Sequence, residues 1–186
     1  MLEAFYPDHE VESAYDIDYE CLFEKGCRGV IFDIDNTLVP HGAPADERAV
    51  TLFARLHKTG FRTVLLSNNK EPRVKLFNDG VGSEYIFKAG KPGREGYERA
   101  MRLMGTMPDN TIFVGDQLFT DIWGAKKAGI ETWLVKPIHP KEEIQIVLKR
   151  RLEWIVLFFY HKNSHKNSHR KARTDGKRNG GRKDEN

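Results

Sequence analysis

The sequence predicts a three-layer α/β fold in which helices cover both faces of a five-stranded, mainly parallel sheet. Short apolar runs rich in β-branched residues alternate with helical patterns between residues 28 and 135. Most successive runs are separated by a stretch long enough for a helix, and strands joined in this way form right-handed crossovers in a parallel sheet. Glycine and proline mark the ends of the helical patterns, which supports the same division into elements.

The predicted strands and helices follow one another in alternation. The strands are expected at Gly29–Phe32, Thr63–Leu66, Tyr85–Phe87, Thr111–Val114 and Thr132–Val135. The first helix is predicted by a stripe of apolar residues at i, i+3, i+4 and i+7, namely Ala49, Leu52, Phe53 and Leu56, between Pro44 and Gly60. Further helices are expected at Pro72–Phe77, Gly93–Met104 and Asp121–Ala128, the last closed by Gly129.

The length of 186 residues suits one such domain rather than two. Residues 1–27 show no clean periodicity and are expected to form an arm that packs on the edge of the domain, which itself spans residues 28–153. A helix that starts after residue 140 becomes apolar on all sides from Trp154 onward. Residues 154–186 are therefore expected to be an apolar helix end followed by a basic, disordered tail.

Charge is distributed unevenly along the chain. Residues 161–186 carry nine Lys and Arg against three Asp and Glu, whereas residues 1–140 carry a net charge of −4. The C-terminal segment has three interpretations: a helix that packs on the sheet with a solubilising tail, a peripheral anchor on anionic membrane, or a non-specific nucleic-acid binder. Nucleic acid is the least favoured partner, because no aromatic residue follows Tyr160 and bases would find no stacking platform.

The expected location is the cytoplasm, with peripheral association on the cytoplasmic side of a membrane as an extension of that expectation. No apolar run approaches the ~20 residues that a membrane-spanning helix needs. The first ten residues lack the basic and apolar regions of a secretory signal. Cys21 and Cys27 are the two cysteines, and their spacing matches no zinc or thioredoxin-type motif, which is typical of a reducing compartment.

Four polar motifs occur at the C-terminal ends of predicted strands or just beyond them, at the edge where open parallel sheets bind ligands. They are Asp33-x-Asp35-x-Thr37, Ser67-Asn68, Lys91-Pro92 and Gly115-Asp116-x-x-x-x-Asp121. The carboxylates of Asp33 and Asp35 repel one another unless a cation, a donor or a shared proton compensates. Such a pair suits one acid that attacks phosphorus and a second that transfers a proton, with a hard divalent metal beside them.

With these motifs in this order, residues 28–136 resemble the haloacid dehalogenase (HAD) superfamily of phosphohydrolases. The form Asp-Ile-Asp-Asn-Thr-Leu, preceded by the arm with Pro7 and Tyr15-Asp16-Ile17-Asp18, is similar to the YqeG-type branch of subfamily IIIA. That branch is related to phosphatidylglycerophosphate phosphatases. The resemblance implies a Rossmann-like domain and a phosphatase activity. An acid at Asp35 favours a phosphatase over a P-type ATPase or a dehalogenase.

The resemblance also implies roles for individual residues. Asp33 would be the nucleophile that forms an aspartyl-phosphate, and Asp35 would protonate the leaving group and later deprotonate water. Ser67, helped by the backbone of Asn68, would bind a phosphoryl oxygen. Lys91 would neutralise charge on the nucleophile and on the phosphoryl group, with Lys88 as the alternative lysine.

The implied cofactor is Mg²⁺, which prefers oxygen ligands and retains several waters. The resemblance assigns to it the Asp33 carboxylate, the Asp35 carbonyl and the Asp116 carboxylate. Asp121 would hold these ligands or reach the ion through water, although it could instead cap the helix that follows. Thr37 is expected to support the ligands from beside them.

The spacing between motifs predicts that no cap domain is inserted. Asp33 and Ser67 are 34 positions apart and Ser67 and Lys91 are 24 apart, and both gaps are already filled by a helix and a strand. An open site suits a bulky phosphomonoester, and a phospholipid head group, through phosphatidylglycerophosphate, is the leading expectation. The alternatives are a phosphatase of a soluble metabolite, a nucleotide or a phosphoprotein. A HAD-fold adaptor that binds RNA or a ribosome through its tail is the non-enzyme alternative. The sequence makes no prediction of oligomeric state.

Overall fold

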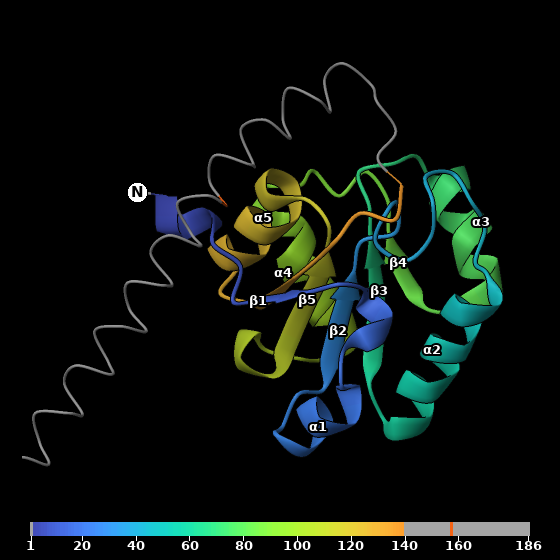
Figure 1. Cartoon of the computed structure of the whole chain (residues 1–186), viewed down its shortest axis with the longest axis horizontal. Helices are drawn as coiled ribbons and strands as arrows, with labels where there is room; N and C mark the ends of the chain where they lie inside the picture. The colour runs from blue at the N-terminus through green and yellow to red at the C-terminus, as the bar shows by residue number, and fades with distance from the viewer. Residues whose placement is uncertain (1, 140–156, 158–186) are drawn as a thin grey trace, which may run out of the picture.

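A computed structural model describes residues 2–139 and residue 157 and shows a parallel sheet between two layers of helices (Figure 1). The strands are β1 His9–Val11, β2 Gly29–Phe32, β3 Arg62–Leu66, β4 Glu84–Ile86, β5 Thr111–Gly115 and β6 Glu131–Val135. The α-helices are α1 Tyr19–Glu24, α2 Glu47–Thr59, α3 Glu71–Val81, α4 Arg94–Met104 and α5 Trp123–Lys127. Short 3₁₀ turns occupy Leu2–Phe5, Ala14–Asp16 and Pro108–Asn110, and a π-helical turn occupies Leu118–Ile122.

The α/β prediction is confirmed, but the predicted number of five strands is wrong because the sheet contains six. The additional strand, β1, lies in the N-terminal arm and pairs in parallel with β6. It has only three residues, and none of them is buried, so it carries no apolar alternation from which a strand could be predicted. Asp8 secures this edge by accepting hydrogen bonds from the backbone N–H and the hydroxyl of Thr132 at 2.9 and 2.7 Å.

The layers follow from the alternation of side chains along the buried strands. Val30 and Phe32 of β2 face a cluster with α2, α3 and the arm, whereas Ile31 faces a cluster with α4 and α5. In β5 the Ile112 side chain joins the first cluster and the Phe113 side chain the second. Both faces of the sheet are thus covered, as expected for near-continuous apolar strands.

The strand order is β1-β6-β5-β2-β3-β4. This order creates a position at the centre of the sheet where ligands bind in folds of this kind. From β2 the chain continues to β3 and β4 on one side, then crosses to β5 and β6 on the other. The connections leaving β2 and β5 therefore diverge, and the crevice between the C-terminal ends of these two strands is a topological switch point. Residues that follow β2 and β5 are the ones positioned there.

The stretches between the motifs hold the short elements that the spacing predicts. Within the described residues, α2 and β3 fill the gap from Asp33 to Ser67, and α3 and β4 fill the gap from there to Lys91. The helix α2 begins after Asp46, whose side chain accepts a hydrogen bond from the N–H of Ala49 at 2.8 Å. No cap domain is inserted in this part of the chain.

Predictions for the C-terminal segment lie outside the described residues. These are the domain end at residue 153 and the basic tail over 154–186, of which only Leu157 is described, in contact with an apolar cluster of Leu118, Ile122 and Leu134. Among the residues that the structure describes, no helix is both long and apolar enough to cross a membrane.

Candidate active site

The residues of the four motifs meet at the C-terminal edge of the sheet. Asp33 follows β2, and its N–H continues the ladder by donating to the carbonyl of Val114 in β5 at 3.0 Å. Ser67 follows β3 and continues that strand's ladder with the carbonyl of Ile86 at 3.0 Å. Asp116 follows β5 directly. These side chains thus begin where the hydrogen-bonded ladders of the central strands end.

Lys91 forms the central ion pair of the site. Its ammonium group lies 2.6 Å from Oδ1 of Asp33 and 2.7 Å from Oδ1 of Asp121. The side chains of Lys91 and Asp121 are 3% and 1% exposed, so water screens this pairing weakly. Lys88, the alternative lysine of the sequence analysis, has an exposed side chain, and the structure brings Lys91 into the site.

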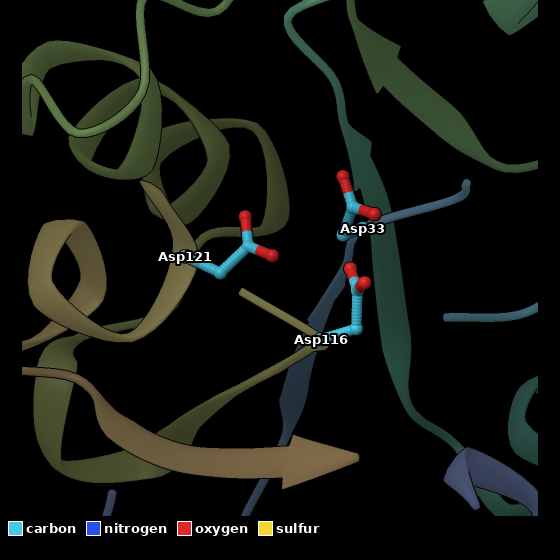
Figure 2. Close-up of side chains that lie close together, drawn as sticks. All are labelled: Asp33, Asp116 and Asp121. Atoms are coloured by element: carbon cyan, nitrogen blue, oxygen red, sulfur yellow. The ribbon is translucent and has the colours of Figure 1, made fainter. Parts of the chain in front are cut away.

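The two carboxylates paired with this lysine form a candidate metal centre with a third, that of Asp116. Asp33, Asp116 and Asp121 each offer one oxygen, and the three oxygens lie within 4.8 Å of one another (Figure 2). Figure 2 shows the Asp121 carboxylate extending from its turn toward the other two. Buried carboxylates are favoured where they are paired or bind a metal, and a hard divalent cation fits this set of three oxygen donors.

The structure places the Asp121 side chain beside those of Asp33 and Asp116, and it does not cap the helix that follows. It lies in the π-helical turn Leu118–Ile122, and its Oδ2 accepts a hydrogen bond from the N–H of Gln117 at 3.1 Å. The helix α5 begins two residues later without a side-chain cap. Thr37, expected to support the ligands, places its hydroxyl 3.3 Å from both Oδ2 of Asp33 and Oδ1 of Asp116.

Tyr97, which the sequence analysis did not select, holds the turn that carries Asp121, and Gly115 of the fourth motif packs against the Asp121 side chain. Tyr97 of α4 donates its hydroxyl hydrogen to the carbonyl of Thr120 at 2.8 Å, with the carbonyl of Asp121 at 3.2 Å. Gly115 lies directly beneath, because a Cβ added there would be 2.7 Å from Oδ2 of Asp121. The glycine of the Gly115-Asp116 motif is therefore required by close packing, not by an unusual backbone angle.

Burial sets the electrostatics of the nucleophile candidate. Burial, together with the nearby Asp121 carboxylate, raises the pKa of Asp33 from 3.8 to about 6, and the Lys91 ammonium opposes this rise. For Lys91, burial alone would lower the pKa, but the carboxylates of Asp121 and Asp33 outweigh burial and raise it. The lysine is therefore a permanent cation, and Asp33 gains its negative charge more readily when a further cation is near.

Asp35 is buried like Asp33, but it belongs to a different network. Its Oδ1 accepts hydrogen bonds from Nε and Nη2 of Arg73 at 3.1 and 2.9 Å and from the N–H of Gly42 at 2.8 Å. Its Oδ2 accepts one from Nδ2 of Asn69 at 2.7 Å. The Asp35 carboxylate is not among the three carboxylates whose oxygens lie within 4.8 Å of one another.

Ser67 and Asn68 are placed differently from one another. The Ser67 side chain is buried, and its Oγ accepts a hydrogen bond from the N–H of Asn69 at 3.1 Å, which leaves the hydroxyl hydrogen to donate. The Asn68 side chain instead holds the backbone of Lys91, because its Oδ1 accepts from the Lys91 N–H at 2.8 Å and its Nδ2 donates to the Lys91 carbonyl at 3.0 Å. Asn68 thus positions the central lysine.

Among the residues that the sequence analysis missed, Arg73 and Asn69 carried a weak signal. Asn69 directly follows the Ser67-Asn68 motif, and Arg73 is a basic residue in the first turn of α3, where acidic residues are usual. Neither observation identifies Asp35 as the partner. Tyr97 carried no such signal, since a tyrosine within an apolar helix stripe is typical of a core residue.

A family model and two known proteins match this chain. Residues 40–129 match the family model described as haloacid dehalogenase-like hydrolase. The chain is 36% identical over 159 residues to the probable phosphatase YqeG of Bacillus subtilis, an alignment that covers 84% of this chain and 92% of that protein. It is 30% identical over 168 residues to phosphatidylglycerophosphate phosphatase 1, chloroplastic/mitochondrial, of Arabidopsis thaliana, covering 81% of this chain and 47% of that protein.

A solved structure agrees with the fold. A putative 3-deoxy-D-manno-octulosonate 8-phosphate phosphatase from Vibrio cholerae superposes with a TM-score of 0.51 over 69% of this chain and 78% of that one. The sequences are 15% identical over the match, so the likeness bears on the fold alone.

Proposed function

Because this chain belongs to the phosphatases of the haloacid dehalogenase-like hydrolase family, we propose that it is a Mg²⁺-dependent phosphomonoester hydrolase with Asp33 as its nucleophile. The observation that carries the proposal is the cluster of Asp33, Asp116 and Asp121 around Lys91, at the switch point of the sheet. Three carboxylate oxygens this close together form a donor set that suits a divalent cation, and the same cation would attract a phosphate dianion.

In the first step, Asp33 attacks the phosphorus atom of the substrate. A bond forms between a carboxylate oxygen of Asp33 and phosphorus, and the bond from phosphorus to the ester oxygen breaks. Lys91, 2.6 Å from Asp33, neutralises charge on the nucleophile and on the phosphoryl oxygens, and the Ser67 hydroxyl donates to one of these oxygens. Asp35 gives its proton to the departing oxygen, so that an alcohol leaves and an aspartyl-phosphate remains.

In the second step, water releases the phosphate. Asp35, now a carboxylate, takes a proton from the water as the water oxygen bonds to phosphorus. The bond between phosphorus and Asp33 breaks, and both residues return to their starting states. The residues that would hold Mg²⁺ are Asp33 and Asp116 through their carboxylates and Asp35 through its carbonyl, with Asp121 beside them. When bound, the ion supplies Lewis-acid stabilisation of the phosphoryl charge.

The substrate proposed is phosphatidylglycerophosphate, a phosphomonoester on a phospholipid head group. The Arabidopsis relative named for that activity supports it. The short elements between the motifs also support it, because in the described residues no inserted domain stands over the site to exclude a bulky ester.

Phosphate release with Mg²⁺ tests both parts of the proposal. We expect the wild type to hydrolyse p-nitrophenyl phosphate and Asp33→Asn to lose at least ~10³-fold of that activity, as expected when a catalytic group acts as part of a unit. Asp109→Asn is the matched control, since this exposed aspartate precedes β5 at the opposite end of the sheet. Full activity in Asp33→Asn would contradict the nucleophile assignment, and an inactive wild type would favour the adaptor alternative.

The substrate is tested by comparing values of kcat/KM. Phosphatidylglycerophosphate in mixed micelles is measured beside glycerol 3-phosphate, a nucleoside monophosphate and a phosphoserine peptide. The proposal expects the largest kcat/KM for the lipid. A larger value for one of the soluble esters would reject the lipid and keep the phosphatase.

Peripheral binding to anionic membrane is the matching proposal for the segment 154–186, which carries the basic tail. Each Lys or Arg near an anionic surface contributes about 1 kcal/mol, so the tail has enough charge to hold the enzyme at its lipid substrate. Flotation with vesicles that contain anionic lipid, for the full chain and for a chain ending at residue 153, measures this. Equal flotation of the two would reject it.

A further inference from the structure

The carboxylate of Asp35 is held by donors from three separate segments. Gly42 belongs to the connection after β2, Asn69 to the connection after β3, and Arg73 to the first turn of α3. The side chains of Arg73 and Asp35 are 13% and 11% exposed, so this ion pair is largely withdrawn from solvent. Each of these donors restricts the rotation of the Asp35 carboxylate, and together they fix its orientation.

Each anchor is itself fixed by the fold. On α3 the buried side chains of Val74 and Phe77 set which face of the helix meets the core, and so set the direction of Arg73. The backbone of Asn69 is fixed by two hydrogen bonds. Its N–H donates to Oγ of Ser67 at 3.1 Å, and its carbonyl accepts from the N–H of Lys88 at 2.9 Å. The donors to Asp35 are therefore held in place by the fold, so rotation of the Asp35 carboxylate would break its hydrogen bonds to them.

The donors are shared unequally between the two carboxylate oxygens. Oδ1 receives three N–H groups, two from Arg73 and one from Gly42, at 2.8 to 3.1 Å. Oδ2 receives one, from Asn69, among the groups that the structure describes. An ionised carboxylate has about four lone-pair positions over two oxygens, so Oδ1 is saturated whereas Oδ2 keeps one position.

One donor of Arg73 is also left over. Its Nη1 atom is buried and has no hydrogen-bond acceptor in the described part of the chain. A buried donor without a partner costs free energy, and a purely stabilising ion pair would be expected to satisfy it. The Arg73 guanidinium therefore donates to Asp35 through Nε and Nη2 while its Nη1 has no acceptor among the described residues.

We infer that Arg73 is a positioning residue for Asp35: with Gly42 it occupies Oδ1, while Asn69 takes one position on Oδ2 and leaves the other for the proton that is exchanged with the ester oxygen. The inference rests on the proposed function, in which Asp35 is the acid of the first step. Proton transfer depends on the direction of the donor, so loss of Arg73 misdirects Oδ2 without removing the acid.

Leaving groups of different basicity separate positioning from mere structure. An alkoxide leaves only with a proton, whereas p-nitrophenolate leaves without one, and kcat/KM reports the step in which the leaving group departs. For Arg73→Gln we expect kcat/KM on glycerol 3-phosphate to fall by ~10–100-fold, within the ~10²–10⁴-fold that acid catalysis provides. On p-nitrophenyl phosphate it should fall by less than about 3-fold.

A double-mutant cycle identifies the residue through which Arg73 acts. In an Asp35→Asn background, adding Arg73→Gln should change kcat/KM on glycerol 3-phosphate by less than about 2-fold, because no acid remains to be positioned. Lys75→Gln is the matched control: it removes a cation from the same helix, and Lys75 is exposed. Arg73→Lys keeps the charge with a single donating atom and should restore part of the loss.

Equal losses on the two substrates, or an undiminished loss in the Asp35→Asn background, would overturn the inference. Thermal unfolding of each variant is measured alongside, and if Arg73→Gln does not fold, Arg73→Lys carries the same comparison of substrates. Failure of the proposed function is distinct, since the wild type would then release no phosphate or Asp33→Asn would remain active.

Discussion

Replacing Lys91 with methionine should lower the free energy of unfolding of the metal-free protein by about 3–5 kcal/mol, the usual cost of breaking a buried ion pair. Methionine keeps most of the volume, so the change is mainly electrostatic. It leaves the Asp33 and Asp121 carboxylates, whose side chains are 10% and 1% exposed, without the ammonium that lies 2.6 and 2.7 Å from them. Two such carboxylates repel each other in a poorly solvated site.

Urea unfolding in EDTA at pH 7.5 measures the effect, with Arg94→Met as the control. Arg94 pairs with Glu98 at 3.0 Å on the surface of α4, with side chains 60% and 39% exposed, and such a pair contributes only about 0.3–0.5 kcal/mol. The double variant with Asp121→Asn should recover part of the loss, because it removes one of the two stranded charges. If Lys91→Met costs no more than Arg94→Met, the site is better solvated than its burial implies and the reasoning fails.

Three further predictions concern the same cluster. Gly115→Ala should cost about 1–3 kcal/mol of stability and weaken Mg²⁺ binding, measured by calorimetry, because the new methyl group would lie 2.7 Å from Oδ2 of Asp121. Tyr97→Phe should cost about 1 kcal/mol and raise the Mg²⁺ concentration needed for half-maximal activity, since it removes the hydroxyl that holds the turn carrying Asp121. Burial raises the pKa of Asp33 from 3.8 to about 6, so the folded state binds this proton more tightly than the unfolded state, and metal-free stability should fall as pH rises from about 4 to 6. Urea midpoints across that range should show a smaller fall in Asp33→Asn, and an identical pH dependence in both proteins would exclude Asp33 as the cause.

Most of the sheet could be predicted from local patterns. The buried strands β2 and β5 are runs of apolar residues, and their predicted and observed bounds agree to within a residue. The N-terminal strand β1 could not be predicted in this way, because three partly exposed residues have no periodicity. What holds it is distant in sequence: β6 as a partner, and hydrogen bonds between Asp8 and Thr132, 124 positions apart.

The candidate site was predicted as a set of residue types but not as a network. The sequence placed Asp33 and Asp116 at strand ends and therefore at one edge of the sheet. It could not assign the partner of each acid, since that depends on distances of a few ångströms between separate elements. Arg73 is the clearest case, because only the orientation of α3 against the core brings its guanidinium to Oδ1 of Asp35 at 2.9 Å.

By itself, the sequence determined the α/β alternation and the order of the motifs, because hydrophobic periodicity and strand-end chemistry are local properties of a chain. The tertiary structure alone decided that Asp121 joins Asp33 and Asp116 around Lys91, while Asp35, two residues from Asp33, belongs to Arg73 and Asn69. The physical reason is that the chain turns after β2: Asp33 still continues the ladder with β5, whereas Asp35 lies beyond it in the connection and its carboxylate meets other elements. Which partner each one meets depends on strand order and helix packing, which are set by contacts between residues far apart in the sequence.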